Sequence, residues 1–273
     1  MATAFSENLT AEQQSQVLQV FQQFQHPSLQ KDLIALNTLK KVEKGGDVLR
    51  IELQLPFAWN TGVEQVKQQL SDALLKATDS KEIKWVVNYQ IATLKRANNQ
   101  PAVKGVKNII AVTSGKGGVG KSSVSVNLAL ALQAQGARVG ILDADIYGPS
   151  VPHMLGAPHQ RPTSPDNQHI TPIKAHGLSA NSIGFLMDED NATIWRGPMA
   201  SSALSQLLNE TLWDSLDYLV IDMPPGTGDI QLTLSQQIPV TGAVVVTTPQ
   251  DIALLDAVKG VSMFERVSVP VLG

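Results

Sequence analysis

The sequence predicts an α/β protein with a small α-β-β-α-β domain at its N-terminus and a larger domain built on a mostly parallel sheet flanked by helices. With 273 residues, the chain is about as long as two average domains. Its first third contains segments in which apolar and polar residues alternate, whereas the rest contains continuous apolar runs typical of strands buried on both faces. A polar segment without periodicity separates the two parts.

The composition excludes several classes of protein. Hydrophobic residues make up 43% of the chain and charged residues 16%, which argues against a disordered or fibrous protein. The formal charge of -3 argues against broad binding to nucleic acid or to an anionic membrane. There is no leader-like start and no apolar run near the roughly 18 residues of a membrane helix. We therefore expect a cytoplasmic protein with no nucleic-acid or membrane partner.

Residues 1–94 are expected to form the small domain. A capping box at Thr10–Gln13 begins an amphipathic helix that stops before His26 and Pro27. The following elements are expected in chain order: a β-hairpin from residues 36–43 and 48–55, a helix over 62–77 and a strand over 83–89.

Residues 95–107 are polar, basic and proline-containing, and we interpret them as a linker. The larger domain then occupies residues 108–273. Its buried strands are expected in the apolar runs at 109–112, 139–142, 218–221 and 243–246. Residues 170–183 suit a hairpin around His176 and Gly177, for which a plain structural role is favoured over contact with a client protein.

The segment Gly115–Ser122 satisfies the pattern G-x-x-x-x-G-K-[ST] of a phosphate-binding loop, which identifies the larger domain as a P-loop NTPase. It lies between the expected strand 108–114 and a helix expected over 121–135, the context that this motif requires. Backbone amides and the helix N-terminus would hold phosphate oxygens, Lys121 would reach the β and γ phosphates of ATP, and the Ser122 hydroxyl would bind Mg²⁺. The residues expected to bind the nucleotide are Gly115, Lys116, Gly117, Gly118, Val119, Gly120, Lys121, Ser122 and Ser123.

Three carboxylates follow two of the expected strands, at the sheet edge where ligands bind in α/β proteins. Asp222 ends the run YLVID, which is typical of a Walker B strand that delivers a carboxylate to the metal. Asp143 is a second candidate for the surroundings of Mg²⁺, and Asp145 is a candidate for orienting the attacking water. We expect both to face the phosphate loop, although an aspartate after a strand can also be no more than a helix cap.

Lys116 has two interpretations. It can be a solvated surface lysine, because a generic phosphate loop needs no cation at its second position. Alternatively, this lysine resembles the signature of the deviant Walker A ATPases, which include MinD, ParA and the nitrogenase iron protein. That resemblance implies a catalytic lysine that reaches the nucleotide of a partner subunit, so that two identical chains form a homodimer across two nucleotides.

Four further segments resemble the Mrp/ApbC family of iron–sulfur cluster carrier ATPases: DADIYGPSVP at 143–152, WRGPM at 195–199, DMPPGTGD at 222–229 and TTPQDIALLDAVKG at 247–260. The resemblance covers both domains, since bacterial members carry a similar small N-terminal domain. It implies an ATPase that holds an iron–sulfur cluster and transfers it to apo-proteins. It also supports the roles assigned to the phosphate loop, Asp143, Asp145 and Asp222.

The chain departs from this family at its C-terminal end. Family members continue past a strand that begins here at Val269, through an Asn-Met segment that helps to hold adenine and a C-x-x-C pair that holds the cluster. This chain ends at Gly273 and contains no cysteine, so it cannot bind a cluster through its own thiolates. We favour a truncated carrier over a relative that has lost the cluster site, because the sheet would otherwise be left unfinished.

Two other functions remain as alternatives. A MinD- or ParA-like positioning ATPase would need a terminal amphipathic membrane helix or a basic DNA-binding patch, and the sequence shows neither. A non-catalytic scaffold would bind ATP without turning it over. The leading interpretation is an ATP- and Mg²⁺-dependent carrier of iron–sulfur clusters.

Overall fold

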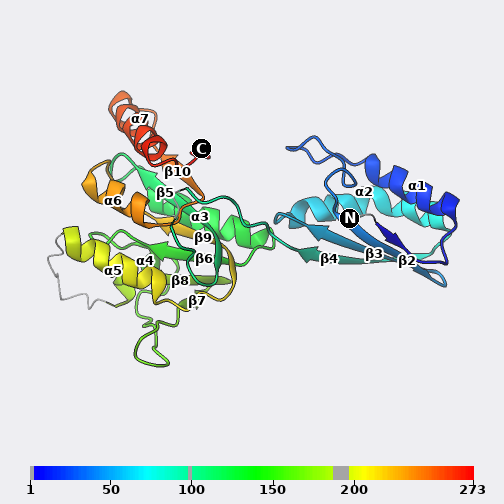
Figure 1. The fold of residues 1–273 in the computed structure, drawn as a ribbon, viewed down its shortest axis with the longest axis horizontal. Coiled ribbons are helices and arrows are strands. Elements are labelled where there is room, and N and C mark those ends of the chain that lie inside the picture. Colours follow the sequence, from blue (N-terminus) through cyan, green and yellow to red (C-terminus); the bar gives the residue numbers. More distant parts are fainter. Residues whose placement is uncertain (1–2, 98–99, 187–196) are drawn as a thin grey trace. The chain divides into compact units, whose positions relative to one another are not determined.

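The computed structural model describes residues 3–97, 100–186 and 197–273. The chain divides into two compact units, Met1–Ala92 and Thr93–Gly273 (Figure 1). Each unit contains its own sheet and its own hydrophobic core.

In the first unit, two helices pack on a four-stranded sheet with the order β1-β2-β3-β4 (Figure 1). Strands β2 and β3 form the expected antiparallel hairpin, whereas β1 and β4 pair in parallel with β2 and β3 respectively. The elements are β1 (Ala4–Phe5), α1 (Ala11–Gln22), β2 (Leu39–Gly45), β3 (Val48–Leu55), α2 (Asn60–Thr78) and β4 (Glu82–Tyr89). The expected α-β-β-α-β pattern is therefore preceded by one more strand, which is too short to give a periodic signal.

The expected capping box starts α1. The Thr10 hydroxyl accepts a hydrogen bond from the Gln13 amide, and the Gln13 side chain accepts one from the Thr10 amide. Both helices turn their apolar faces to the sheet, where alternate residues of β3 are buried. This core includes Val17, Phe21, Leu49, Ile51, Leu53, Val66 and Leu74.

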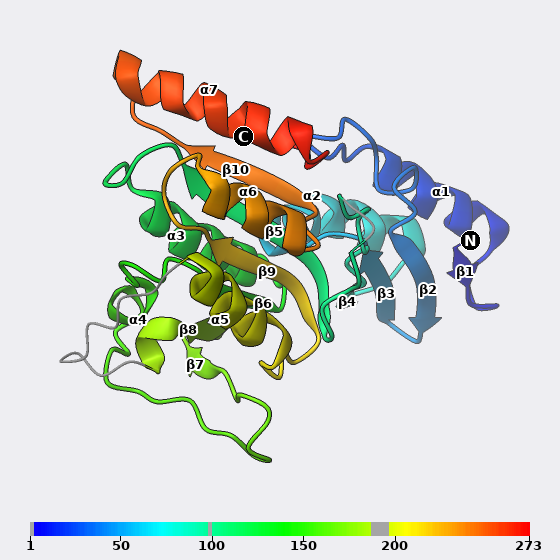
Figure 2. The same cartoon turned by 60° about the vertical axis from the view of Figure 1, so that its left-hand side comes forward.

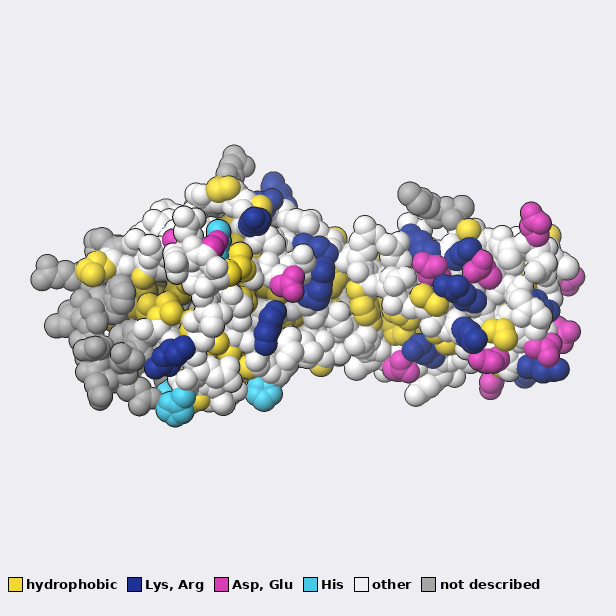
Figure 3. Space-filling model, turned by 90° about the horizontal axis from the view of Figure 1, so that it is seen from below, with side chains coloured by type: hydrophobic (Ala, Val, Ile, Leu, Met, Phe, Trp, Pro, Cys, Tyr) yellow, Lys and Arg dark blue, Asp and Glu magenta, His cyan; other side chains and the backbone are white. Residues whose placement is uncertain are grey.

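On the face seen in Figure 3, basic and acidic side chains of the first unit are interspersed. Three ion pairs at its surface have this mixed character: Lys41–Glu43, Lys67–Glu64 and Lys81–Asp47. Such exposed pairs contribute little to stability, but the mixture leaves no surface of a single charge on this face of the unit.

The second unit contains a six-stranded sheet with the order β10-β5-β9-β6-β8-β7. All neighbouring strands are parallel except β7, which is antiparallel to β8. The four apolar runs predicted as buried strands all lie in this sheet, which confirms the predicted fold class. The strands are β5 (Val106–Ser114), β6 (Val139–Asp143), β7 (Ile173–Ala175), β8 (Leu178–Ser182), β9 (Leu216–Asp222) and β10 (Gly242–Val246).

Helices cover both faces of this sheet. Figure 2 shows α5 and α6 on one face and α3 on the other, as right-handed crossover connections require. Helix α7 packs against β10 and β5. The helical elements are α3 (Lys121–Ala134), α4 (Val151–Met154), the 3₁₀ turn Ile183–Phe185, α5 (Gly197–Asn209), α6 (Asp229–Gln237) and α7 (Asp251–Arg266).

The predicted hairpin at 170–183 is present as β7 and β8. Its turn is made by His176 and Gly177, which have φ angles of 50° and 80°. All five residues of β8 are buried beside β6, so this hairpin is an integral part of the sheet.

The strand expected from Val269 does not begin there. Val271 makes an isolated parallel bridge with Ala243 of β10, and the Ala243 amide donates to the carbonyl of Pro270. The structure therefore has only a short paired segment at the β10 edge where the sequence predicted a strand.

Candidate nucleotide-binding site

The predicted phosphate loop joins the end of β5 to the start of α3, as the motif requires. Gly118 and Gly120 have φ angles of 80° and 94°, in the left-handed region. A Cβ atom at either position would meet no other atom within 4 Å, so the backbone conformation, and not crowding, favours glycine there. The loop borders a cavity of about 350 Å³.

This cavity collects residues from three loops at the carboxyl edge of the sheet. Seven of the predicted site residues line it: Gly117, Gly118, Gly120, Lys121, Ser122, Ser123 and Asp145. Four others were not expected from the sequence: Ser114, Ser150, Met154 and Pro225. Gly115, Lys116 and Val119 belong to the loop but lie outside this lining.

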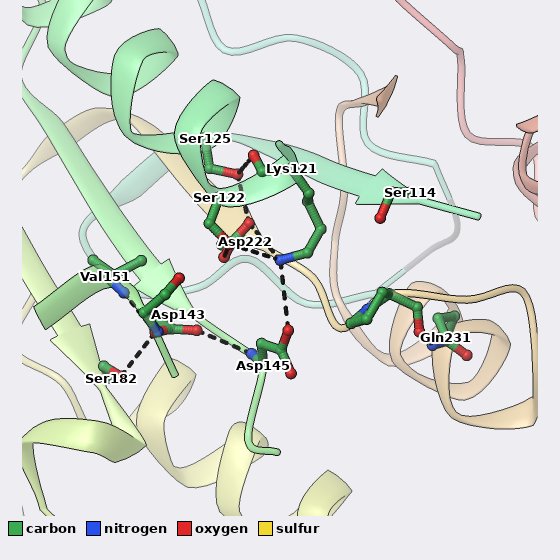
Figure 4. Close-up of polar contacts among 12 residues, drawn as sticks. Ser114, Lys121, Ser122, Ser125, Asp143, Asp145, Val151, Ser182, Asp222 and Gln231 are labelled. Carbon is green, nitrogen blue, oxygen red and sulfur yellow. Dashed lines mark hydrogen bonds and ion pairs between the residues drawn. The ribbon is translucent and has the colours of Figure 1, made fainter. Parts of the chain in front are cut away.

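Lys121 is the cation of the site. Its side chain is only 6% exposed, and its Nζ lies 2.8 Å from Oδ1 of Asp222 and 3.7 Å from Oδ2 of Asp145. Figure 4 shows the side chain reaching between these two carboxylates. An ammonium can bind phosphate oxygens of a nucleotide through charge-assisted hydrogen bonds.

Asp222 is buried at the end of β9 and is contacted by three side chains. Its Oδ2 accepts a hydrogen bond of 2.6 Å from the Ser122 hydroxyl, and its Oδ1 accepts one of 2.6 Å from the Ser125 hydroxyl (Figure 4). Sequence reasoning missed Ser125, although it lies one helical turn after Lys121 on α3. The hydroxyl and carboxylate oxygens of Ser122 and Asp222 are the donor types that Mg²⁺ prefers, so the residues present fit this metal.

Asp143 lies beneath the cavity and is buried. Its Oδ2 accepts hydrogen bonds from the amides of Ser150 and Val151 and from the Ser182 hydroxyl, and its Oδ1 accepts one from the Asp145 amide. The carboxylate thus fixes the turn that follows β6 and stays outside the lining of the cavity. Burial, reinforced by the negative charge of Asp222, raises the pKa of Asp143 to about 7.

Asp145 lies on the same turn but faces the cavity. Burial raises its pKa, and the nearby Lys121 ammonium opposes this rise. Of the two carboxylates expected to face the phosphate loop, the structure therefore brings Asp145 to Lys121 and turns Asp143 toward the backbone of the 150–151 segment.

Lys116 points to α7. Its Nζ lies 3.6 Å from Oδ2 of Asp256, and the side chain is 42% exposed. The Ser114 hydroxyl donates a hydrogen bond of 2.7 Å to the Lys116 carbonyl. Trp195 and Arg196 of the WRGPM segment lie outside the described residues.

The described part of the chain shows neither a cluster of three metal-ligating side chains nor a helix that could cross a membrane. Among residues 3–97, 100–186 and 197–273, no three His, Asp or Glu side chains gather in a way that could hold a metal ion. Within the same ranges, no helix combines the length and the apolar character needed to span a bilayer.

Comparison with known proteins identifies the family. Residues 105–273 match the ParA family model described as NUBPL iron-transfer P-loop NTPase. The chain is 90% identical over its whole length to an iron–sulfur cluster carrier protein of Haemophilus influenzae, of which it covers 74%. It is 66% identical, over 92% of its length and 68% of the relative, to an iron–sulfur cluster carrier protein of Escherichia coli.

Among solved structures, the chain resembles a nucleotide-binding protein from Archaeoglobus fulgidus in complex with ADP. The TM-score is 0.55 and the identity 39%, over 63% of this chain and 66% of that one. These findings confirm the family resemblance predicted from the sequence motifs. The chain therefore belongs to the family of iron-transfer P-loop NTPases, and its Haemophilus influenzae and Escherichia coli relatives are named iron–sulfur cluster carrier proteins.

Proposed function

We propose that this chain is the Mg²⁺-dependent ATPase part of an iron–sulfur cluster carrier. The observation that carries the proposal is the group formed by Lys121 and Ser122, which line the cavity, and by Asp222, which lies outside that lining, is fully buried and contacts both. It unites a buried cation for phosphate oxygens with a hydroxyl–carboxylate pair suited to Mg²⁺.

The proposed roles follow from this geometry. The backbone amides of residues 115–120 and the N-terminus of α3 hold the phosphates, and Lys121 neutralises charge on the β and γ phosphates. Ser122 and Asp222 hold Mg²⁺ directly or through water, and the metal neutralises further phosphate charge when bound. Asp145 lines the same cavity and orients the attacking water. Asp143 serves the metal site indirectly, because it fixes the turn that carries Asp145.

Lys116 is proposed to act on the nucleotide of a second copy of the chain, in a homodimer. Phosphoryl transfer asks for positioning and charge neutralisation more than for covalent chemistry, and a cation supplied by a partner subunit satisfies that need. The side chain lies outside the lining of its own cavity, which supports a role elsewhere.

The iron–sulfur cluster is the proposed cargo, delivered to apo-proteins in the cytoplasm. The chain contains no cysteine, so thiolate ligands for the cluster must come from outside these 273 residues. The relatives that suggest this cargo are longer: the chain covers 74% of the Haemophilus influenzae carrier.

Calorimetric titration with Mg-ATP, combined with a turnover assay, tests the ATPase. We expect saturable binding and slow hydrolysis, both lost in Lys121→Met and retained in Lys104→Met, which changes an exposed lysine. Binding without turnover would favour the scaffold alternative, and absence of binding would contradict the proposal. Anaerobic reconstitution with iron and sulfide is expected to give a cluster spectrum with the Haemophilus influenzae relative and none with this chain alone.

A further inference from the structure

We propose that Asp256 is a positioning residue that holds Lys116 within its own chain and so opposes the contact of Lys116 with a partner's nucleotide. The proposal rests on the proposed function, because it assumes that Lys116 acts in a homodimer. It assigns to α7 a restraint on assembly.

Asp256 lies between two lysines and offers one oxygen to each. Its Oδ2 is 3.6 Å from Nζ of Lys116, and its Oδ1 is 3.0 Å from Nζ of Lys259, one turn further along α7. The carboxylate is 22% exposed, against 42% for Lys116 and 65% for Lys259. Asp256 is thus the least exposed of the three side chains, and both lysines pair with it.

The backbone of α7 is packed directly on the start of the phosphate loop. A Cβ atom placed on Gly115 would lie 2.5 Å from Cβ of Asp256 and 2.6 Å from its carbonyl carbon. Only glycine permits this approach, which brings the residue preceding Lys116 against the residue that binds Lys116. The Ser114 hydroxyl, bonded to the Lys116 carbonyl, further fixes the loop backbone. The ion pair therefore joins two segments that already lie in contact.

The Lys116 ammonium cannot contact Asp256 and the phosphates of a partner's nucleotide at the same time. When Lys116 pairs with Asp256, it cannot extend to the phosphates of a second chain, so each Lys116 that crosses must first leave Asp256. A partly exposed pair of this kind changes an equilibrium about twofold to fivefold. A symmetric dimer contains two such lysines, so the restraint weakens dimerisation by the square of this factor, about fourfold to twenty-five-fold.

A substitution of Lys259 should change dimerisation in the opposite direction to a substitution of Asp256. It competes with Lys116 for the same carboxylate, so its removal leaves Asp256 to Lys116 alone. Asp256→Asn is therefore expected to strengthen dimerisation, whereas Lys259→Ala is expected to weaken it. A purely structural role for α7 would give the same sign for both changes.

The test is the dimer dissociation constant, measured by sedimentation velocity with Mg²⁺ and a non-hydrolysable ATP analogue. Asp256→Asn is expected to lower this constant about fourfold to twenty-five-fold, and Lys259→Ala to raise it. Glu265→Gln is the matched control, because it removes the same charge from an exposed position of the same helix and should leave the constant unchanged. In a Lys116→Ala background, Asp256→Asn should have no effect.

The outcomes separate the restraint from the function on which it rests. If the wild-type chain dimerises and Asp256→Asn leaves the constant unchanged or raises it, the restraint is wrong while the proposed function stands. An effect of Asp256→Asn that persists without Lys116 also overturns the restraint. If the wild-type chain binds the analogue and stays monomeric, the role of Lys116 in a second chain is wrong, and the restraint falls with it.

Discussion

The Nζ atom of Lys121 lies 2.8 Å from Oδ1 of Asp222, and both side chains are almost completely buried. This pair joins the first residue of α3 to the last residue of β9, which are 101 positions apart in the chain. Hydroxyls of Ser122 and Ser125 donate to the same carboxylate, so the negative charge is compensated on both oxygens. The Lys121 ammonium and the two hydroxyls therefore connect α3 to β9 at the site.

Removal of the Lys121 cation is expected to destabilise the fold as well as to abolish nucleotide binding. Lys121→Met leaves the buried carboxylates of Asp222 and Asp145 without their ammonium, which should lower the free energy of unfolding by about 3–5 kcal/mol. Urea denaturation at pH 7 measures this loss. Lys104→Met provides the control, and an equal stability for the two variants would show that the pair contributes nothing.

The raised pKa of Asp143 predicts that stability decreases as the pH rises. The folded chain keeps a proton on this carboxyl up to about pH 7, whereas the unfolded chain releases it near 3.8. Because the folded state binds more protons in this window, the free energy of unfolding should fall between the two values, by on the order of 4 kcal/mol at about 1.4 kcal/mol per pKa unit.

Asp143→Asn should remove this part of the pH dependence, leaving the contribution of Asp145, whose pKa burial also raises, and the opposite one of His26, whose pKa burial lowers. Urea denaturation from pH 4 to pH 8 compares the two slopes. Asp72→Asn, at a surface position of α2, serves as the control and should keep the wild-type slope. A wild-type stability that rises across the window would contradict the predicted direction.

Asp217 lies near the start of β9, at the end opposite to Asp222. Its effect on the pH dependence of stability should be the reverse of that of Asp143. Burial alone would raise its pKa, but hydrogen bonds from Arg138 and Lys107 bring it below the usual value. Its contribution is therefore present above the ordinary pKa of 3.8 and lost as the pH falls through the folded value. Asp217→Asn is expected to cost about 1–3 kcal/mol at pH 7 and progressively less as the pH falls below 3.8, measured in urea. A cost that stays constant as the pH falls below 3.8 would argue for packing instead of charge.

Lys116→Ala is expected to reduce ATP turnover by about 10³ to 10⁵ if the lysine acts on a partner's nucleotide as an arginine finger does. Affinity for Mg-ADP should change little, since the side chain lies outside the cavity of its own chain. Turnover and calorimetry on the same preparation separate the two effects. A near-normal turnover would restore the interpretation of Lys116 as a solvated surface lysine.

The sequence predicted much of the fold because most elements carry a local signal. Strands β5, β6, β9 and β10 are continuous apolar runs, and the Thr10 capping box marks the start of α1. Strand β1 escaped prediction because two residues show no periodicity. The strand expected at Val269 was placed too early, because apolar character does not reveal where pairing with β10 begins.

For the site, the sequence by itself predicted which residues form the phosphate loop, because the motif that contains the glycines, Lys121 and Ser122 spans eight consecutive positions. It also placed Asp145 in the turn after one strand and Asp222 at the end of another. Only the tertiary structure decided that Ser125 bonds to Asp222, that Asp143 faces the amides of Ser150 and Val151, and that Asp256 receives Lys116. The direction of a side chain depends on what packs against it. The partners of Ser125 and Lys116 come from segments about a hundred residues or more away, brought together by the order of strands in the sheet.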